Sequence, residues 1–258
     1  MVESRLGAPI VATGPQTIEI VGVAGSGKST LARVLRARHG CHVADSLHTR
    51  LPAHWPYVAH SLPRVLRVVA ASVRERPLPS WDELKFVAYV AEWDRFLRAE
   101  HRNGAGTIVL DQGPMFAIAR LLWGGKPITR HPSFEMWLQR MVEHWSRELD
   151  AIVLLDAPDD VLLARIDVRG QGHDAKGAPV LEGLELIRRH RQAYARVLEL
   201  IESAASTRML RYDTASMPPA RIAGELAGIF ELSRVQELTE TPRAPNLIHG
   251  SAPSREDA

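Results

Sequence analysis

The sequence is poor in cysteine, because Cys41 is the single one among 258 residues. One cysteine can form neither a disulfide bond within the chain nor a metal site of several cysteines, so both are excluded. The chain also lacks the run of about 18 uninterrupted apolar residues that a membrane-spanning helix requires. Its first residues are not followed by the long apolar run that a secretory signal requires. We therefore expect a cytoplasmic protein with no membrane partner.

An excess of charge of one sign is likewise absent, because 32 lysines and arginines face 30 aspartates and glutamates, for a formal net charge of +2. Such a balance does not favour nucleic acid or a membrane surface as a partner. Hydrophobic residues make up 45% of the chain and charged residues 24%, which is ordinary for a globular protein. A chain of this length can build one sizeable α/β core, and we expect one domain with insertions.

What the chain does contain is a glycine-rich segment at 22–30 that reads Gly-Val-Ala-Gly-Ser-Gly-Lys-Ser-Thr. It fits the Walker A, or phosphate-binding loop, pattern G-x-x-x-x-G-K-[ST]. Residues 17–21 before it are β-branched and largely apolar, which predicts a strand. Apolar side chains recur at helical spacing after it, and Gly40 is placed to end that helix. The alternative, a glycine-rich turn that binds nothing, is disfavoured by the lysine–serine pair and by both flanks.

The chemistry of this segment follows from its geometry. Glycines let successive backbone N–H groups turn toward a polyphosphate, and the start of the next helix adds unpaired N–H groups and a positive dipole end. We expect Lys28 to reach the β- and γ-phosphates of ATP and the Ser29 hydroxyl to ligate Mg²⁺. The predicted nucleotide-binding residues of the segment are Gly22, Ala24, Gly25, Ser26, Gly27, Lys28, Ser29 and Thr30.

Two further predicted strands end in a carboxylate. The first, 41–45, ends in Asp45, and the second, 107–111, ends in Asp111. Ligands in open parallel sheets lie beyond the carboxyl ends of the strands, which would place Asp45 at the nucleotide cleft. With Ser46, it could equally well cap the next helix or turn. We expect Asp111 to hold Mg²⁺ rather than only to start a turn, because its strand and the phosphate loop support each other.

A candidate lid follows the predicted strand at 151–156. The helix after that strand carries Arg165 and Arg169 four residues apart, on one helical face, and the polar segment 170–177 comes next. A mobile segment of this kind can close over phosphates and supply cationic groups to a transition state. We predict a lid at about 165–180; the alternative is a plain surface loop.

The remaining sequence predicts how the domain is organised. Residues 1–16 form a flexible lead, 17–235 form the domain, and 236–258, rich in Thr, Pro, Ser and charge, form a disordered tail. A helical insertion at about 47–103 contains two amphipathic helices, the second of them starting at Ser80 with a capping box. Further predicted elements are helical residues at 115–149 with Trp123, Trp137 and Trp145 in the core or lining the cleft, a helix at 184–203, a strand at 209–214 and a helix at 218–235.

Taken together, these elements resemble the phosphate-loop nucleoside and nucleotide kinases, and among them the deoxynucleoside kinases and thymidylate kinases. The matching pieces cover most of residues 17–232 as an order of elements, and the phosphate loop is the specific motif among them. They are 22–30, Asp45, Asp111, 151–158, Arg165 with Arg169, and Tyr212-Asp213-Thr214. The resemblance implies a three-layer α/β fold with a parallel sheet of about five strands flanked by helices, a helical insertion and a lid.

The resemblance also implies roles for single residues. The carboxylate after the second strand can act as the base on an acceptor hydroxyl, which corresponds to Asp45. Lid arginines grip the donor phosphates, which corresponds to Arg165 and Arg169, and the loop after the last strand lies by the adenine, which corresponds to a segment starting at Asp213. The chain departs from the family pattern at Gln112. An arginine that binds the acceptor or its phosphate normally stands there, so the resemblance does not identify the acceptor.

The predicted function is transfer of the γ-phosphoryl group of ATP, with Mg²⁺, to a small acceptor that carries a hydroxyl or a phosphate and is nucleoside- or nucleotide-like. One alternative is a mechanical or regulatory ATPase, which commonly has a glutamate after the strand-end acid, where this chain has Gln112. A GTP switch protein would need an Asn-Lys-x-Asp string that the chain lacks. A third alternative is a module whose nucleotide is structural. The oligomeric state is open, a homodimer included.

Overall fold

The computed structural model describes residues 15–44, 80–124, 127–130, 132–168, 177, 179–204 and 207–232. Several predictions fall outside these residues: the flexible lead up to residue 14, the first helix of the insertion, most of the lid segment and the tail, and with them Asp45 and Arg169. Gln16, predicted to belong to the lead, is instead the buried first residue of a strand. Across the described ranges, every helix is too short or too polar to span a bilayer.

Five strands form one parallel sheet in the order β2-β3-β1-β4-β5. They are β1 (Gln16–Val21), β2 (His42–Ala44), β3 (Thr107–Leu110), β4 (Ala151–Asp156) and β5 (Arg208–Asp213). The central strand, β1, pairs with β3 on one side and with β4 on the other. Because all strands run the same way, the segments that follow β1, β3, β4 and β5 gather at one edge of the sheet.

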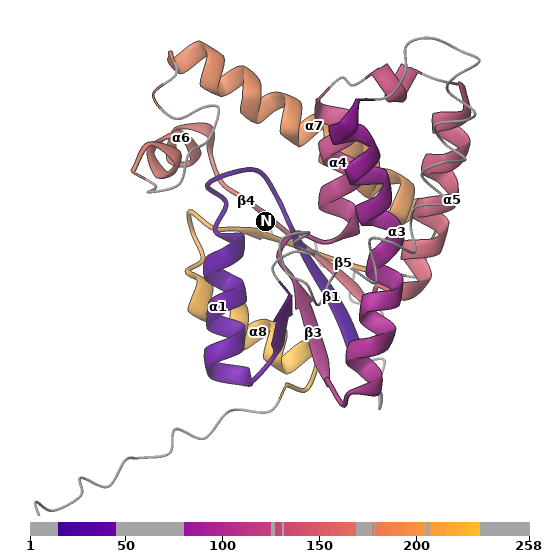
Figure 1. The fold of residues 1–258 in the computed structure, drawn as a ribbon. Helices are drawn as coiled ribbons and strands as arrows, with labels where there is room; N and C mark the ends of the chain where they lie inside the picture. The colour runs from indigo at the N-terminus through magenta and orange to yellow at the C-terminus, as the bar shows by residue number, and fades with distance from the viewer. Residues whose placement is uncertain are drawn as a thin grey trace, which may run out of the picture.

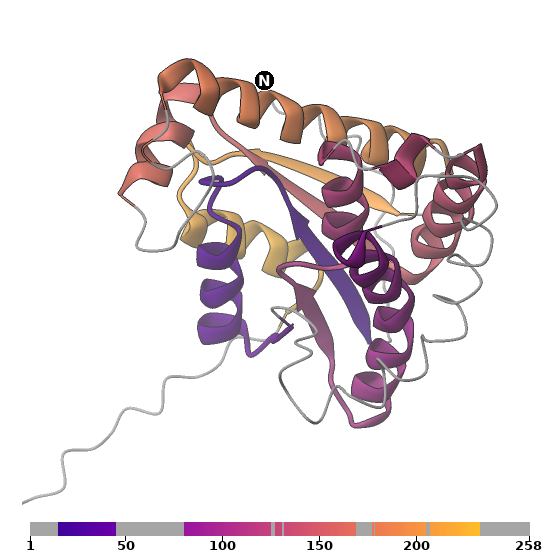
Figure 2. The same ribbon diagram turned by 45° about the horizontal axis from the view of Figure 1, so that its top comes forward.

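Helices cover both faces of this sheet, which gives the predicted three layers (Figures 1 and 2). On one face lie α1 (Lys28–His39) and α8 (Pro219–Ile229), which pack against each other. The other face carries α3 (Trp81–Arg102), α4 (Pro114–Trp123), α5 (Pro132–Glu148) and α7 (Val180–Ala204). Two shorter helices complete the described part, α6 (Asp159–Asp167) and the 3₁₀ helix η2 (Pro127–Arg130).

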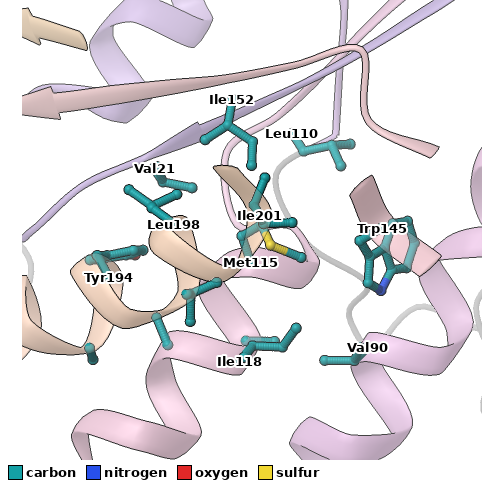
Figure 3. Packing of buried hydrophobic residues seen from close by; sticks show 14 of the residues in the cluster. Val21, Val90, Leu110, Met115, Ile118, Trp145, Ile152, Tyr194, Leu198 and Ile201 are labelled. Atoms are coloured by element: carbon teal, nitrogen blue, oxygen red, sulfur yellow. The ribbon is translucent and has the colours of Figure 1, made fainter. Parts of the chain in front are cut away.

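The residues of β1 alternate between two hydrophobic clusters. Ile18 and Ile20 are fully buried in the cluster beneath α1 and α8, whereas Val21 is buried in the cluster beneath α4 and α7. Figure 3 shows the second cluster, in which Met115 of α4 and Ile201 of α7 lie under the sheet. A strand buried on both faces is typical of a parallel sheet covered by helices, and here it places the end of β1 at the centre of the molecule.

Local sequence signals set several helix ends as predicted. Ser80 and Glu83 form the capping box of α3, with the Ser80 side chain accepting from the Glu83 N–H group and the Glu83 carboxylate accepting from the Ser80 N–H group. Gly40 ends α1 in the left-handed region at φ 63°, where glycine carries no steric penalty. Other bounds differ from those predicted, because α7 begins at Val180 and α8 ends at Ile229. Helix ends are weakly encoded where no cap residue marks them.

Candidate functional site

The phosphate-binding loop occupies the turn between β1 and α1, and its glycines are required by geometry. Gly22 has φ 144°, and a Cβ atom on it would overlap the carbonyl oxygen of Leu155 in β4. A Cβ atom on Gly25 would lie 2.8 Å from the carbonyl oxygen of Leu162 in α6. The loop therefore lies directly against the backbone of two other segments, and only glycine fits at these two positions.

Lys28 is the first residue of α1, and its side chain folds back over the loop. Its Nζ atom donates hydrogen bonds to the carbonyl oxygens of Gly22 at 2.7 Å and Val23 at 2.9 Å. The ammonium group is thus held at the mouth of the loop. Ser26 is fully buried in the loop, and its hydroxyl oxygen has no hydrogen-bond partner within the described ranges.

A cavity of about 730 Å³ opens where the loop, the end of β3 and residues of α1, α4, α6, α7 and α8 meet. One part of its wall is the phosphate loop with the start of α1, and the rest comes from segments far away in the sequence. The lining residues are Gly22, Ala24, Gly25, Gly27, Lys28, Ser29, Thr30, Arg33, Asp111, Gln112, Phe116, Arg120, Trp123, Arg165, His190, Tyr194, Thr214 and Pro219.

Asp111, one of the predicted metal ligands, follows β3 directly and is only 5% exposed. Its backbone N–H group donates to the carbonyl oxygen of Ala44 at 3.1 Å, which ties it to the end of β2. It lines the cavity together with Ser29. A carboxylate and a hydroxyl are the oxygen ligands that Mg²⁺ accepts in phosphate sites, so the donor set present fits this metal.

Arg165, the predicted lid arginine that falls inside the described residues, reaches the cavity from α6. Its Nη1 atom donates to the hydroxyl of Thr214 at 2.9 Å and to the carbonyl oxygen of Gly25 at 3.3 Å. Its Nη2 atom donates to the carbonyl oxygen of Thr214 at 3.0 Å. The guanidinium therefore lies between the phosphate loop and the segment after β5, at the wall of the cavity.

Asp213, predicted to lie by the adenine, ends β5 and is not among the residues that line the cavity. Its carboxylate accepts from the N–H group of Ala215 at 2.8 Å and so stabilises the turn after the strand. The next residue, Thr214, lines the cavity in its place. Side chains alternate between the faces of a strand, so a shift of one residue changes which side chain meets the site.

The cavity wall beyond the loop comes from α4 and α7, and sequence reasoning singled out only Trp123 there, as a core or cleft residue. Phe116, Arg120 and Trp123 line it from α4, and His190 and Tyr194 line it from α7. The signal that would have found them is their spacing, i, i+4, i+7 in α4 and i, i+4 in α7, which puts each set on one helical face. Both helices border the phosphate loop only in the folded chain.

A buried glutamate, Glu19, was missed as well, because the strand around it is largely apolar. It lies on β1 and is fully buried, and its carboxylate accepts from the N–H groups of Met115 at 3.0 Å and Phe116 at 2.9 Å. A Cβ atom on Gly113 would lie 2.6 Å from the carboxyl carbon. Glu19 therefore holds the first turn of α4, the helix that starts just after Asp111 and whose Phe116 lines the cavity.

Burial changes the proton affinity of Glu19 and Tyr194. It raises the pKa of Glu19 to about 8, although the N–H groups of Phe116, Met115 and Gly113 act in the opposite direction. It also raises the pKa of Tyr194, an effect to which the nearby carboxylates of Glu19 and Asp111 add. Glu19, which binds the first turn of α4 and lies near Tyr194 of the cavity wall, can thus hold a proton near neutral pH.

A phosphate loop between β1 and α1, with a parallel sheet in the order β2-β3-β1-β4-β5, defines the fold of the phosphate-loop kinases. Solved structures with this fold are similar to the chain. A deoxyadenosine kinase from M. mycoides with bound dATP matches with a TM-score of 0.50 and 12% identity, over 83% of this chain and 99% of that chain. A thymidylate kinase from Candida albicans matches with a TM-score of 0.52 and 16% identity, over 84% and 92%.

At such identities the likeness concerns the fold, and at that level the predicted resemblance to nucleoside and nucleotide kinases is confirmed. No protein-family model and no curated protein sequence matches the chain.

Proposed function

We propose that this protein is an ATP- and Mg²⁺-dependent kinase that transfers the γ-phosphoryl group to a small acceptor with a hydroxyl or phosphate group, nucleoside- or nucleotide-like acceptors being the first to test. The observation that carries the proposal is the shared cavity. Its wall joins a phosphate loop to a ring-lined region built by α4 and α7, with Asp111 and Arg165 beside the loop. A phosphotransferase needs both parts, because donor and acceptor must meet in one water-poor space.

Close packing of Gly22 and Gly25 against other backbone segments keeps side chains off the loop, as a loop that turns its backbone N–H groups toward a polyphosphate requires. When bound, MgATP supplies the phosphoryl group and a divalent positive charge. Lys28 would hold the phosphates, and Ser29 with Asp111 would hold the metal. Arg165 would stabilise negative charge that develops during transfer.

Three further roles rest on the sequence. Asp45 would take the proton from an acceptor hydroxyl, whereas a phosphate acceptor needs no base. Arg169 would add a second lid cation, and the segment at Asp213 would lie by the adenine. A cytoplasmic setting, the lack of nucleic-acid and membrane partners, and the homodimer remain predictions of the same kind.

A phosphate-loop ATPase or a regulatory nucleotide-binding protein is the alternative. The ring-lined part of the cavity favours a kinase, because hydrolysis requires room for a water molecule and not for an acceptor. ATP turnover without any acceptor separates the two, since rapid hydrolysis with no stimulation by small molecules supports the ATPase.

The decisive experiment is an acceptor screen with ATP and Mg²⁺ over nucleosides, nucleotides, sugars and antibiotics. Lys28→Ala should lower turnover with any active acceptor by at least about 10²-fold, because the phosphates lose their cationic contact. Arg140→Ala, on the exposed side of α5, is the matched control and should leave turnover as in the wild type. Turnover by Lys28→Ala at the wild-type rate would overturn the proposal. Asp45→Asn should lower turnover by roughly 10² if the acceptor is a hydroxyl.

A further inference from the structure

Arg120 on α4 lies in the ring-lined part of the cavity. Its Cζ atom is 4.1 Å from the ring centroid of Trp123 and 6.0 Å from that of Phe86 on α3. The Trp123 ring packs in turn against His190 of α7. Rings of α3 and α4 therefore lie against the guanidinium, and the His190 ring packs against Trp123. Cation–π contacts of this kind orient a cation without neutralising it.

Arg120 has no carboxylate partner among the described residues, unlike several other arginines. Arg191 pairs with Asp156 at 2.9 Å, and Arg196 pairs with Glu135 at 2.7 Å. No described aspartate or glutamate forms an ion pair with Arg120, although its side chain is half-buried. With no carboxylate bound to it, the guanidinium still has N–H groups that can donate to an oxyanion.

The position of Arg120 separates it from the polyphosphate. It comes six residues after Pro114, about 9 Å of helical rise from the start of α4, whereas Asp111 and the loop border that start. Its contact with Trp123, the last residue of α4, keeps the guanidinium toward the far end of the helix. Lys28 and Arg165 lie at the loop itself, so the charge of the triphosphate does not account for Arg120.

We infer that Arg120 binds an anionic group of the acceptor, a phosphomonoester or a carboxylate, at the end of the cavity away from the phosphate loop. The acceptor is then an anionic small molecule whose reacting group points to the loop and whose second, charged group meets Arg120. This inference rests on the proposed function. Arg120 would supply a charged contact to the acceptor, which Gln112, an exposed neutral residue, cannot make.

The test uses the full chain and probes that share one ring. With the loop saturated by Mg²⁺ and the non-hydrolysable analogue AMP-PNP, phenyl phosphate, benzoate and neutral benzamide are titrated by calorimetry at constant ionic strength. We expect phenyl phosphate or benzoate to bind about 10-fold more tightly than benzamide, as a charge-assisted hydrogen-bonded pair does over a neutral one. The tighter of the two anions identifies the class of the acceptor's charged group.

Arg120→Met keeps an apolar stem against Trp123 and should abolish the preference for the anion. Arg120→Lys keeps the charge without the planar fork and should retain part of it. Arg140→Met, on the exposed side of α5, is the matched control and should behave as the wild type. Equal binding of the three probes by the wild type, or binding of none, overturns the inference, as does an unchanged preference in Arg120→Met.

The first step of the same titration separates this inference from the proposed function. If the wild type does not bind Mg²⁺·AMP-PNP, the proposed function fails. If the analogue binds and the probes show no dependence on Arg120, the anionic subsite is wrong while the proposed function stands.

Discussion

Arg165 and Thr214 join two segments that are 49 residues apart in the chain. The guanidinium donates both to the hydroxyl and to the carbonyl oxygen of Thr214, and it also reaches the carbonyl oxygen of Gly25. One side chain thereby links α6, the turn after β5 and the phosphate loop. This contact therefore ties the position of α6 to the phosphate loop.

Replacing Arg165 by Met should lower turnover by about 10²-fold, because a cation near the transferring phosphoryl group is lost. Thr214→Val removes one of the acceptors and leaves the carbonyl, so it should lower the free energy of unfolding by only about 1 kcal/mol. Steady-state kinetics and urea unfolding of both single variants and of the double variant measure the coupling. Strictly additive effects would show that the two residues act independently.

The loop glycines should differ in their tolerance of alanine. Gly22→Ala places a Cβ atom on the Leu155 carbonyl in a backbone conformation that alanine disfavours, and should cost more than about 3 kcal/mol of stability. Gly27→Ala meets no atom within 4 Å and has φ 93°, so only backbone strain of about 1–2 kcal/mol is expected. Thermal unfolding of the two variants is the measurement. Equal losses would mean that contact with β4 does not shape the loop.

Asp111→Asn should weaken Mg²⁺-dependent nucleotide binding by about 10- to 100-fold, by analogy with the loss of other groups that hold a metal site. Binding of ATP in the presence of a chelator should change much less, since the loop and Lys28 remain. Calorimetric titrations of ATP with and without Mg²⁺ compare the two conditions. The same Mg²⁺ dependence in the variant and the wild type would remove Asp111 from the metal site.

Glu19 should make stability depend on pH. Its pKa in the folded chain is raised to about 8 from an ordinary value near 4.5, so the folded state binds the proton more tightly than the unfolded state. The stabilisation from that proton is complete below about pH 4.5 and is lost as the pH rises toward 8, with a slope of up to about 1.4 kcal/mol per pH unit.

The Glu19→Gln variant cannot titrate at this position. The free energy of unfolding of the wild type minus that of the variant should therefore decrease as the pH rises from 5 to 8. Urea unfolding at a series of pH values measures it, and groups that titrate in both proteins cancel in the comparison. A difference that stays constant over this range would contradict a raised pKa.

Several features of the fold could be predicted from local patterns. The phosphate loop, its flanking strand and helix, and the caps at Gly40 and Ser80 depend on residues close in the sequence. The β1, β3 and β4 segments have short apolar runs bounded by turn residues, which identify them as buried strands. The resemblance to known kinases supplied the strand count and the layers, which spacing alone does not contain.

The cavity wall formed by α4 and α7 could not be predicted in the same way. Phe116 and Arg120 have the spacing of an ordinary amphipathic helix, and such a face more often packs in a core than lines a cavity. Whether it meets a core or a ligand depends on how α4 crosses α7. The role of Glu19 could not be predicted for a related reason. Its hydrogen-bond partners belong to α4, which is distant in the sequence and lies next to the strand only in the folded chain.

The sequence by itself determined the glycine-rich turn of phosphate-loop pattern between β1 and α1, since that turn is built from neighbouring residues with their own conformational preferences. Only the tertiary structure decided which residues line the cavity together with this turn. Asp111, Arg120, Arg165 and Tyr194 come from four different segments, and the order of strands in the sheet sets their distances from the loop. Contacts between segments far apart in the chain are set by the whole core, which no local pattern encodes.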